Sequence, residues 1–374
     1  MILSEEHELL REAVREIALK ELAPRAEDAD HNMTFPAAQL KALAASGMLM
    51  IKYPEKYGGA GGDNLASAIV AEETARECLS SSTTSLVQML SGDCIFLYGT
   101  EEQKMKYMPK MATGELLGCF ALTEPGAGSD ASNMSTVGVD KGDHYLVNGT
   151  KTFITNAEYG DFIVAFVKTN PERGARGVTA MILEKGQFQV SKHEDKMGMR
   201  ASNTCEVVIK DAKVPKENVL GKPGLGFIIA MSALNGGRIG AAAQAVGMMQ
   251  AMLDESIAYA KQREQFGKPI GSNQAIQWMI ADMAKDLNAA RQLTYHAAAL
   301  TDSGKPSSTE ASMAKLFATE VGIKHASNAV QIHGGYGYCK PSKVERMYRD
   351  IRILTIYEGT SEVQRMVISN NIMK

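Results

Sequence analysis

The sequence lacks the marks of a secreted, disulfide-bonded or membrane protein. Its 374 residues hold five cysteines, widely scattered and without a C-x-x-C pair, which predicts reduced thiols rather than a disulfide framework or a zinc knuckle. The longest apolar runs, residues 163–167 and 227–230, are far shorter than the roughly 20 residues that cross a bilayer. No basic segment followed by an apolar one stands at the N-terminus, so we expect a cytoplasmic protein with no membrane contact.

Charge of one sign and the common catalytic motifs are also missing. The 40 basic and 43 acidic residues leave a net charge of -3, which predicts no nucleic-acid partner. No G-x-x-x-x-G-K, H-E-x-x-H, G-x-S-x-G or G-x-G-x-x-G motif occurs, which argues against a P-loop, a zinc protease, an α/β-hydrolase and a Rossmann fold. The seven histidines include no pair at ligand spacing beside a carboxylate, so we expect no metal site.

Hydrophobic periodicity divides the chain into three parts. We expect an α+β multidomain fold with an N-terminal α-helical domain (1–116), a middle antiparallel β-barrel domain (117–223) and a C-terminal four-helix bundle domain (224–374). Capping boxes are expected at Thr100 and Ser307, and Pro24 is expected to end the first helix. Further helices are predicted over residues 39–49, 65–78, 241–263, 274–303, 310–332 and 361–372. Strands are predicted over residues 119–123, 144–148, 152–155, 162–168, 178–183, 188–191 and 206–209.

Three glycine clusters are candidate binding loops, although a plain turn is the commoner meaning of glycine. They lie at residues 58–62, 126–130 and 334–337. The middle cluster follows a predicted strand that ends in Thr123-Glu124-Pro125. There Gly128 would let the backbone approach a bound group closely, and Ser129 and Thr123 would offer hydroxyl and N–H groups to a phosphate or a heterocycle.

Glu358 lies in a loop directly before the last predicted helix. One interpretation is a surface carboxylate that interacts with the helix dipole. The other follows from the apolar residues 353–356 that precede it, because a carboxylate buried among such groups has a raised pKa and can accept a proton from carbon.

Six motifs follow one another along the chain: residues 119–130 (CFALTEPGAGSD), 148–156 (NGTKTFITN), 236–240 (GGRIG), 263–267 (REQFG), 331–335 (QIHGG) and 356–362 (IYEGTSE). In this order they resemble the acyl-CoA dehydrogenase family, most of all its short-chain, butyryl-CoA-dehydrogenase-like members. The resemblance covers essentially the whole chain. It implies the same order of helical, β and helical domains, one FAD per subunit and a homotetramer. It also implies an acyl-CoA substrate and an electron-transfer flavoprotein as partner in fatty acid metabolism.

The resemblance also assigns site residues. Those expected to line the flavin and its pyrophosphate are Phe120, Leu122, Thr123, Gly128 and Ser129, and those expected to cover the isoalloxazine ring are Phe153, Ile154 and Thr155. Those expected to reach the adenosine half across a subunit contact are Arg263, Phe266, Gln274, Gln331, Gly334 and Gly335, with Thr360 and Glu362 completing the site. The positions that match contacts to coenzyme A are Ser129, Asn235, Arg238 and Gly359.

The implied reaction is α,β-dehydrogenation of a thioester. Glu358 would take a proton from C2 while a hydride leaves C3 for the flavin, and its backbone N–H would help to hold the thioester oxygen. Some relatives place the base directly before the Arg of the 236–240 motif, but that position is Gly237 here, which leaves Glu358. Two positions depart from the family: many relatives have an acid in place of Asn235 and some an Arg in place of Asn370, which weakens the expected coenzyme A contacts.

Other interpretations stay open from the sequence. An enoyl-CoA reductase would use the same fold and cofactor in the reverse direction, and an oxidase would pass electrons to O₂. A non-catalytic helical binding protein would leave Glu358 and the flavin motifs unexplained. Arg263 also fits a solvated helix charge, and Arg238 also fits a structural ion pair. The resemblance favours short acyl chains, whereas the residues themselves do not specify chain length or branching.

Overall fold

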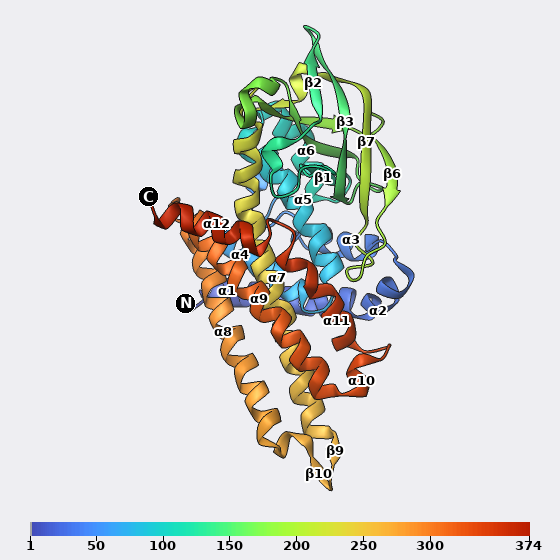
Figure 1. Cartoon of the computed structure of the whole chain (residues 1–374), viewed down its shortest axis with the longest axis vertical. Coiled ribbons are helices and arrows are strands. Elements are labelled where there is room, and N and C mark those ends of the chain that lie inside the picture. The colour runs from blue at the N-terminus through green and yellow to red at the C-terminus, as the bar shows by residue number, and fades with distance from the viewer. Residues whose placement is uncertain (1) are drawn as a thin grey trace.

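The chain runs from helices through a β-sheet and back to helices, which confirms the predicted order (Figure 1). The structure is a computed structural model that describes residues 2–374. Within that range no helix combines the length and apolarity that a membrane span requires. The helices before the sheet are α1 Glu5–Ile17, α2 Ala23–Asn32, α3 Ala37–Ala45, α4 Asn64–Ala75, α5 Leu79–Tyr98 and α6 Glu101–Ala112.

The N-terminal helices begin and end largely where their caps predict. The Thr100 hydroxyl accepts from the Gln103 N–H at 3.2 Å, and the Gln103 side chain accepts from the Thr100 N–H at 2.8 Å, so the capping box is present. The predicted stop at Pro24 is wrong. Pro24 lies in the first turn of α2, where no backbone N–H is needed, and a π-helical turn over Ala18–Leu22 joins α1 to α2.

Helix α5 is not predicted by the sequence, because its first half is a run of Ser and Thr residues that favour turns. In the structure these side chains are buried, and several bond within the helix. The Thr84 hydroxyl, for example, donates to the Ser80 carbonyl at 3.0 Å. The polar run is therefore compatible with a central helix.

The middle part forms one sheet of eight strands. Its strands are β1 Gly118–Ala121, β2 Val137–Asp140, β3 His144–Thr155, β4 Phe162–Lys168, β5 Val178–Glu184, β6 Gln189–His193, β7 Thr204–Pro215 and β8 Val219–Leu220. The order is β6-β7-β3-β2-β4-β5-β8, and β1 pairs with β4. Most pairs are antiparallel as expected, but β1 and β2 each run parallel to β4. The runs at 144–148 and 152–155 form the single strand β3, and β2 and β8 were not predicted.

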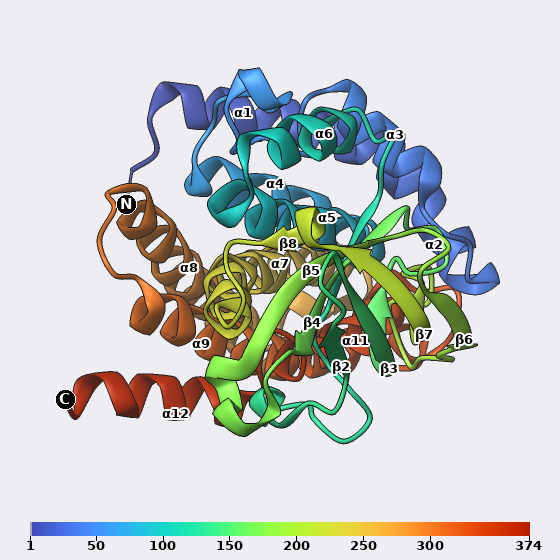
Figure 2. The same cartoon turned by 90° about the horizontal axis from the view of Figure 1, so that it is seen from above.

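The C-terminal part contains three long helices and a final helix that projects from the body (Figures 1 and 2). Its elements are α7 Gly226–Gln262, β9 Glu264–Gln265, β10 Lys268–Pro269, α8 Gln274–Asp302, α9 Ser308–His333, α10 Gly335–Tyr338, α11 Lys343–Ile351 and α12 Ser361–Ile372. The capping box expected at Ser307 is absent, because the Ser307 hydroxyl instead accepts from Asn235 Nδ2 at 3.0 Å and from the Thr301 hydroxyl at 2.7 Å.

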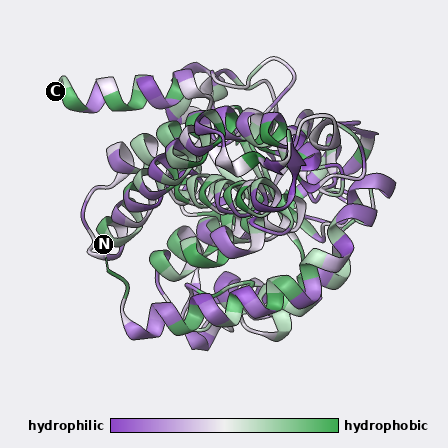
Figure 3. Cartoon of the chain, turned by 90° about the horizontal axis from the view of Figure 1, so that it is seen from below, coloured by the Kyte–Doolittle hydropathy of each residue, from purple (hydrophilic) through white to green (hydrophobic). Residues whose placement is uncertain are grey.

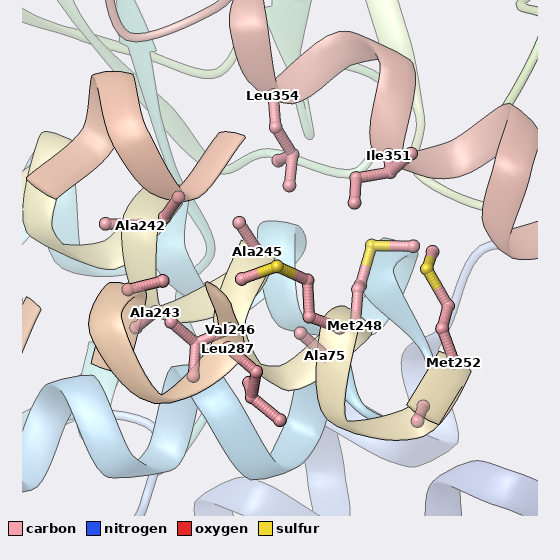
Figure 4. Packing of buried hydrophobic residues seen from close by; sticks show 14 of the residues in the cluster. Ala75, Ala242, Ala243, Ala245, Val246, Met248, Met252, Leu287, Ile351 and Leu354 are labelled. Atoms are coloured by element: carbon pink, nitrogen blue, oxygen red, sulfur yellow. The ribbon is translucent and has the colours of Figure 1, made fainter. Parts of the chain in front are cut away.

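Helix α7 lies at the centre of the molecule. It contacts α4, α5, α8, α9 and β5, and Figure 2 shows it end-on with helices on several sides and the sheet beside it. The packing side chains are small or flexible: alanines such as Ala242 and Ala245 allow helices to approach closely, and Met248 and Met252 fill the gaps (Figure 4). Ile351 and Leu354 close this core from above, which fixes the segment just before Glu358.

Hydropathy follows the same arrangement. In Figure 3 the helices at the centre of the molecule are mainly hydrophobic, whereas the outer helices and the projecting α12 alternate between hydrophobic and hydrophilic residues. Amphipathic outer helices of this kind pack one face on the core and expose the other.

Candidate active site

The loop between α11 and α12 presents Glu358 in an unusual backbone conformation. Glu358 has φ 55° and Gly359 has φ 92°, so two consecutive residues are left-handed. Thr360 then begins α12, and its side chain accepts from the Val363 N–H at 3.3 Å. This turn directs the Glu358 side chain back toward α7 instead of along the helix that follows.

Helix α7 has a gap at the point where the Glu358 carboxylate arrives. A Cβ atom on Gly237 would lie 2.2 Å from Oε2 of Glu358 and 3.0 Å from Cδ2 of Leu90. No side chain larger than a hydrogen atom fits between these groups. Gly237 thus leaves the space that the carboxylate occupies.

The Glu358 carboxylate is sheltered from water. Its Oε2 atom is buried and accepts no hydrogen bond from any group among residues 2–374. Burial raises the pKa of the carboxyl to about 7, against the opposing effect of the positive charges of Lys315 and Arg238. The side chain is therefore a partly desolvated carboxylate and not a solvated surface acid.

Arg238 is buried beside this carboxylate. It is 5% exposed, and burial lowers the pKa of its guanidinium while Glu358 acts to raise it. No carboxylate among the described residues lies within 4.0 Å of it, and its Nε has no hydrogen-bond partner there. A structural ion pair thus does not account for its burial, and its positive charge acts on the Glu358 carboxyl.

A small cavity of about 20 Å³ lies between α5 and α7 on the same side of α7 as Gly237. Its lining is apolar at Leu86 and Leu90 and polar at Lys52 and Asp93, which form an ion pair at 2.8 Å. Leu86 lies against Gly240, where an added Cβ would be 2.4 Å from Cδ1 of Leu86. The cavity is therefore small, and Leu86 bounds it where α5 packs against Gly240.

The glycine loop after β1 faces open space. A Cβ on Gly126 or Gly128 would meet no atom within 4 Å, and Ser129 is exposed. Leu122 is buried below this loop, whereas Phe120 and Thr123 are partly buried. The loop is thus anchored by buried side chains, and its glycine backbone has open space beside it.

A buried ion pair between Lys151 and Glu124 fixes one side of this loop. Lys151 Nζ lies 2.8 Å from Oε1 of Glu124 and donates to the carbonyls of Leu122 and Phe166 at 3.2 and 2.6 Å. The second carboxylate oxygen of Glu124 accepts from the N–H and hydroxyl of Ser135. These contacts lower the pKa of Glu124 to about 2 although burial alone would raise it. The sequence motifs contain both residues, but nothing in their pattern indicated this pairing.

The end of β3 offers an aromatic ring to the same region. Phe153 has φ 57° and is 63% exposed, whereas the neighbouring Ile154 is 1% exposed and Thr155 is partly buried. An exposed aromatic residue in a left-handed conformation is unusual.

The other predicted cofactor residues lie elsewhere in the chain. The β9–β10 hairpin and α10 are at the end of the molecule opposite the sheet (Figure 1). The exposed residues of this group are Arg263, Phe266, Gln274, Gln331, Gly334 and Gly335. Arg263 lies over the ring of Tyr336 at 5.7 Å, so the hairpin and the glycine turn are neighbours. Within one chain, the hairpin and the 334–337 glycine turn lie next to each other, at the end away from the glycine loop after β1.

The remaining predicted positions lie close to Glu358 in sequence or on α7. Thr360 and Glu362 line an open groove of about 430 Å³ together with Arg352. Asn235 is partly buried and its Nδ2 donates to Ser307, which leaves its Oδ1 buried without a partner. Gly359 contributes its carbonyl to the contacts that fix the loop.

Two residues of the site were not predicted. Lys315 on α9 is fully buried and donates from Nζ to the Gly359 carbonyl at 2.5 Å. Gln364 on α12 is also fully buried and donates from Nε2 to the carbonyls of Glu358 and Gly359 at 3.1 and 2.8 Å. A signal for Lys315 exists in the sequence, because it interrupts the apolar stripe of Ala311, Ala314 and Ala318 on one face of its helix.

Comparison with known proteins matches all three parts of the chain. The acyl-CoA dehydrogenase N-terminal, middle and C-terminal domain families match residues 4–115, 119–212 and 224–373. The 3-(aryl)acrylate reductase of Clostridium sporogenes is 48% identical over 377 residues, and the caffeyl-CoA reductase–Etf complex subunit of Acetobacterium woodii is 48% identical over 378, with 100% of each chain covered. The structure of butyryl-CoA dehydrogenase from Megasphaera elsdenii is similar with a TM-score of 0.98 and 40% identity, and the match covers 100% of both chains.

Proposed function

The chain belongs to the acyl-CoA dehydrogenase family of oxidoreductases, and we propose that it catalyses α,β-dehydrogenation of a short-chain acyl-CoA with FAD and with Glu358 as base. The observation that carries the proposal is the Glu358 carboxylate, whose buried, unpartnered oxygen faces a glycine gap with a pKa raised to about 7. Such a group can accept a proton near neutral pH.

The residues near Glu358 suit a thioester. The buried Arg238 and Lys315 make the surroundings positive, which stabilises negative charge as it develops on the substrate. The backbone N–H of Glu358 is the donor that we assign to the thioester oxygen. Polarising that carbonyl lowers the barrier to removing the C2 proton, a role worth about 3 kcal/mol for one well-placed donor.

The flavin assignment fits residues at both ends of the site. The open surface over Gly126 and Gly128 provides backbone groups for a pyrophosphate, and the exposed Phe153 provides a flat apolar face for a tricyclic ring. When bound, FAD supplies the acceptor for the C3 hydride. Leu122, Ile154 and the Lys151–Glu124 pair hold the shape of this surface, and Thr155 offers a hydroxyl at its edge.

The adenosine half of the cofactor requires a second subunit in this proposal. The β9–β10 hairpin, which directly follows Arg263, lies at the end of the molecule opposite the sheet that carries the glycine loop after β1 (Figure 1), and Phe266 is fully exposed. We therefore include a homotetramer in the proposal. Light scattering should give about four times the 40.3 kDa chain mass.

The cavity supports a short substrate. Its volume of about 20 Å³ is close to that of one water molecule, and Leu86 closes it against α7. An acyl chain that entered this cavity beside Gly237 would have to be short, because Leu86 packs against Gly240. The match to a butyryl-CoA dehydrogenase supports the same size class.

The reverse reaction is a second candidate function, favoured by the relatives that are reductases. In that direction protonated Glu358 would donate to C2 of an enoyl-CoA. An electron-transfer flavoprotein is the partner that we assign for either direction, because one such relative is part of a reductase–Etf complex.

The proposal is tested by anaerobic titration of the FAD-loaded protein with a panel of acyl-CoA thioesters, followed by the loss of flavin absorbance. Butyryl-CoA should bleach the flavin, Glu358→Gln should abolish bleaching, and Glu320→Gln, an exposed carboxylate paired with Arg365, should not change it. Bleaching by Glu358→Gln at the rate of the unchanged protein would overturn the assignment. Enoyl-CoA reduction with reduced electron-transfer flavoprotein, measured in parallel, distinguishes the two directions.

A further inference from the structure

Lys315 lies outside all six sequence motifs, yet it contacts the loop that carries Glu358. It projects from the middle of α9 into the core, is 0% exposed, and donates a hydrogen bond from Nζ to the Gly359 carbonyl at 2.5 Å. Burying a lysine is costly unless its charge is paired or used. No carboxylate among the described residues lies within 4.0 Å of it, so a salt bridge does not provide the compensation.

The group that Lys315 contacts is the left-handed turn that carries Glu358. Two carbonyls of this turn are fixed by three hydrogen bonds, one from Lys315 and two from Gln364. Glu358 has φ 55°, in the left-handed region that is unfavourable for a residue with a side chain. Contacts from α9 and α12 hold the chain in this conformation, in which the carboxylate points at Gly237.

The charges around the turn come from four elements. Arg238 on α7 and Lys315 on α9 act to lower the pKa of Glu358, and burial acts to raise it. Burial raises the pKa of the adjacent Tyr357 phenol above its ordinary value, so it stays uncharged near neutral pH. Burial lowers the pKa of Lys315 to about 8. Glu358 acts most strongly to raise it, and Glu362 on α12 and Glu320 on α9 act in the same direction.

We propose that Lys315 is a positioning residue for the reaction: it fixes the Glu358–Gly359 turn through the Gly359 carbonyl and supplies a buried positive charge that keeps the Glu358 carboxylate ionised. The inference rests on the proposed function of Glu358 as base. Gln364 shares the first role but not the second, because its amide carries no charge. The two residues therefore form a matched pair for experiment.

The test compares Lys315→Met with Gln364→Met in the FAD-loaded protein. Both variants should lower the rate of flavin reduction by butyryl-CoA, by about ten- to a hundred-fold, because a base displaced by about 1 Å loses that much. Only Lys315→Met should move the pH at which the rate reaches half its maximum, upward by about one unit or more, because an opposite charge has been removed. Lys324→Met, an exposed lysine on the same helix, is the control and should change neither quantity.

A second readout does not depend on turnover. Infrared difference spectra of protein labelled with ¹³C-glutamate, with Glu358→Gln subtracted, report the pH at which the Glu358 carboxyl loses its proton. This pH should rise in Lys315→Met and stay within a few tenths in Gln364→Met. If Lys315→Met does not retain flavin, Lys315→Gln keeps a donor without the charge and should show the same rise.

Each outcome bears on the inference separately from the proposed function. Unchanged rate and unchanged pH dependence in Lys315→Met would overturn the inference while leaving Glu358 as base. Equal losses in both variants with no movement along the pH axis would also overturn it, because a purely structural contact explains that pattern. If Glu358→Gln bleaches normally, the proposed function itself fails. The infrared measurement then tests only whether the charge of Lys315 keeps the Glu358 carboxyl ionised.

Discussion

The carboxylate of Glu358 and the missing side chain of Gly237 are complementary. Oε2 of Glu358 occupies a position 2.2 Å from where a Cβ of residue 237 would stand, well inside the contact distance of two atoms. A base on the C-terminal loop thus requires the absence of any side chain on the facing turn of α7. A side chain at position 237 and the carboxylate of Glu358 would occupy the same space.

Substituting Gly237 by Ala should displace the base. The added methyl group would collide with Oε2 of Glu358, and the rate of flavin reduction by butyryl-CoA should fall by about a hundred-fold or more while flavin binding is retained. Gly236→Ala is the matched control on the same helix, because its Cβ would meet only the Asp93 carboxylate at 3.1 Å and Lys52 Nζ at 3.6 Å. Stopped-flow absorbance measures both. Equal effects of the two substitutions would contradict the steric explanation.

The rate should depend on pH with opposite signs in the two directions. Glu358 has a pKa of about 7, and dehydrogenation needs its deprotonated form. The dehydrogenation rate should therefore rise as the pH passes upward through about 7, and enoyl-CoA reduction should fall over the same interval. Single-turnover kinetics from pH 5 to 9, an interval of about two units on each side of the pKa, would show this. A flat profile in both directions would mean that another group limits proton transfer.

The buried ion pair between Lys151 and Glu124, beside the glycine loop after β1, should stabilise the folded protein. Lys151→Met leaves Glu124 buried without its cation, which should lower the free energy of unfolding by about 3 to 5 kcal/mol. Lys106→Met removes an exposed partner of Glu184 and should cost less than about 1 kcal/mol. Denaturant unfolding followed by circular dichroism measures the difference. The variant should also bind FAD more weakly, since the loop that Glu124 anchors through Ser135 would relax.

Acyl-chain length should depend on Leu86. Leu86→Ala opens the cavity at Gly240, and the ratio of kcat/KM for hexanoyl-CoA to that for butyryl-CoA should rise by about ten-fold or more. Leu97→Ala, on the same helix but 53% exposed, should leave the ratio unchanged. If both variants prefer butyryl-CoA as strongly as the unchanged protein, a different element ends the acyl site.

Much of the fold is readable from the sequence where local signals agree with the packing. The last helix was predicted over 361–372 and is observed as Ser361–Ile372, because Thr360 is a strong cap at one end. The Ser307 cap failed because tertiary contacts from Asn235 and Thr301 took its hydroxyl. Helix α5 was hidden because its polar face is buried against other helices, which local propensity does not encode.

Site residues that belong to a sequence motif could be predicted, whereas residues that reach the site only through long-range contacts could not. Glu358 could be singled out from its apolar neighbours, and Gly237 by comparison of positions. Lys315 and Gln364 reach the turn only because α9 and α12 pack beside it, and no pattern in the sequence specifies that α9 and the Glu358 loop meet. In the proposed homotetramer, Arg263 and Gln331 reach the cofactor of a second subunit, which the order of residues along one chain does not describe.

The two carbonyls held by Gln364 make the extreme C-terminus part of the chemistry. A premature stop codon or a protease cut ahead of residue 364 would leave most of the sheet and the helical bundle intact yet release the turn that aims the base. Such a product would be recovered as a folded protein without turnover. For the same reason, affinity tags and fusion partners belong at the N-terminus of this chain.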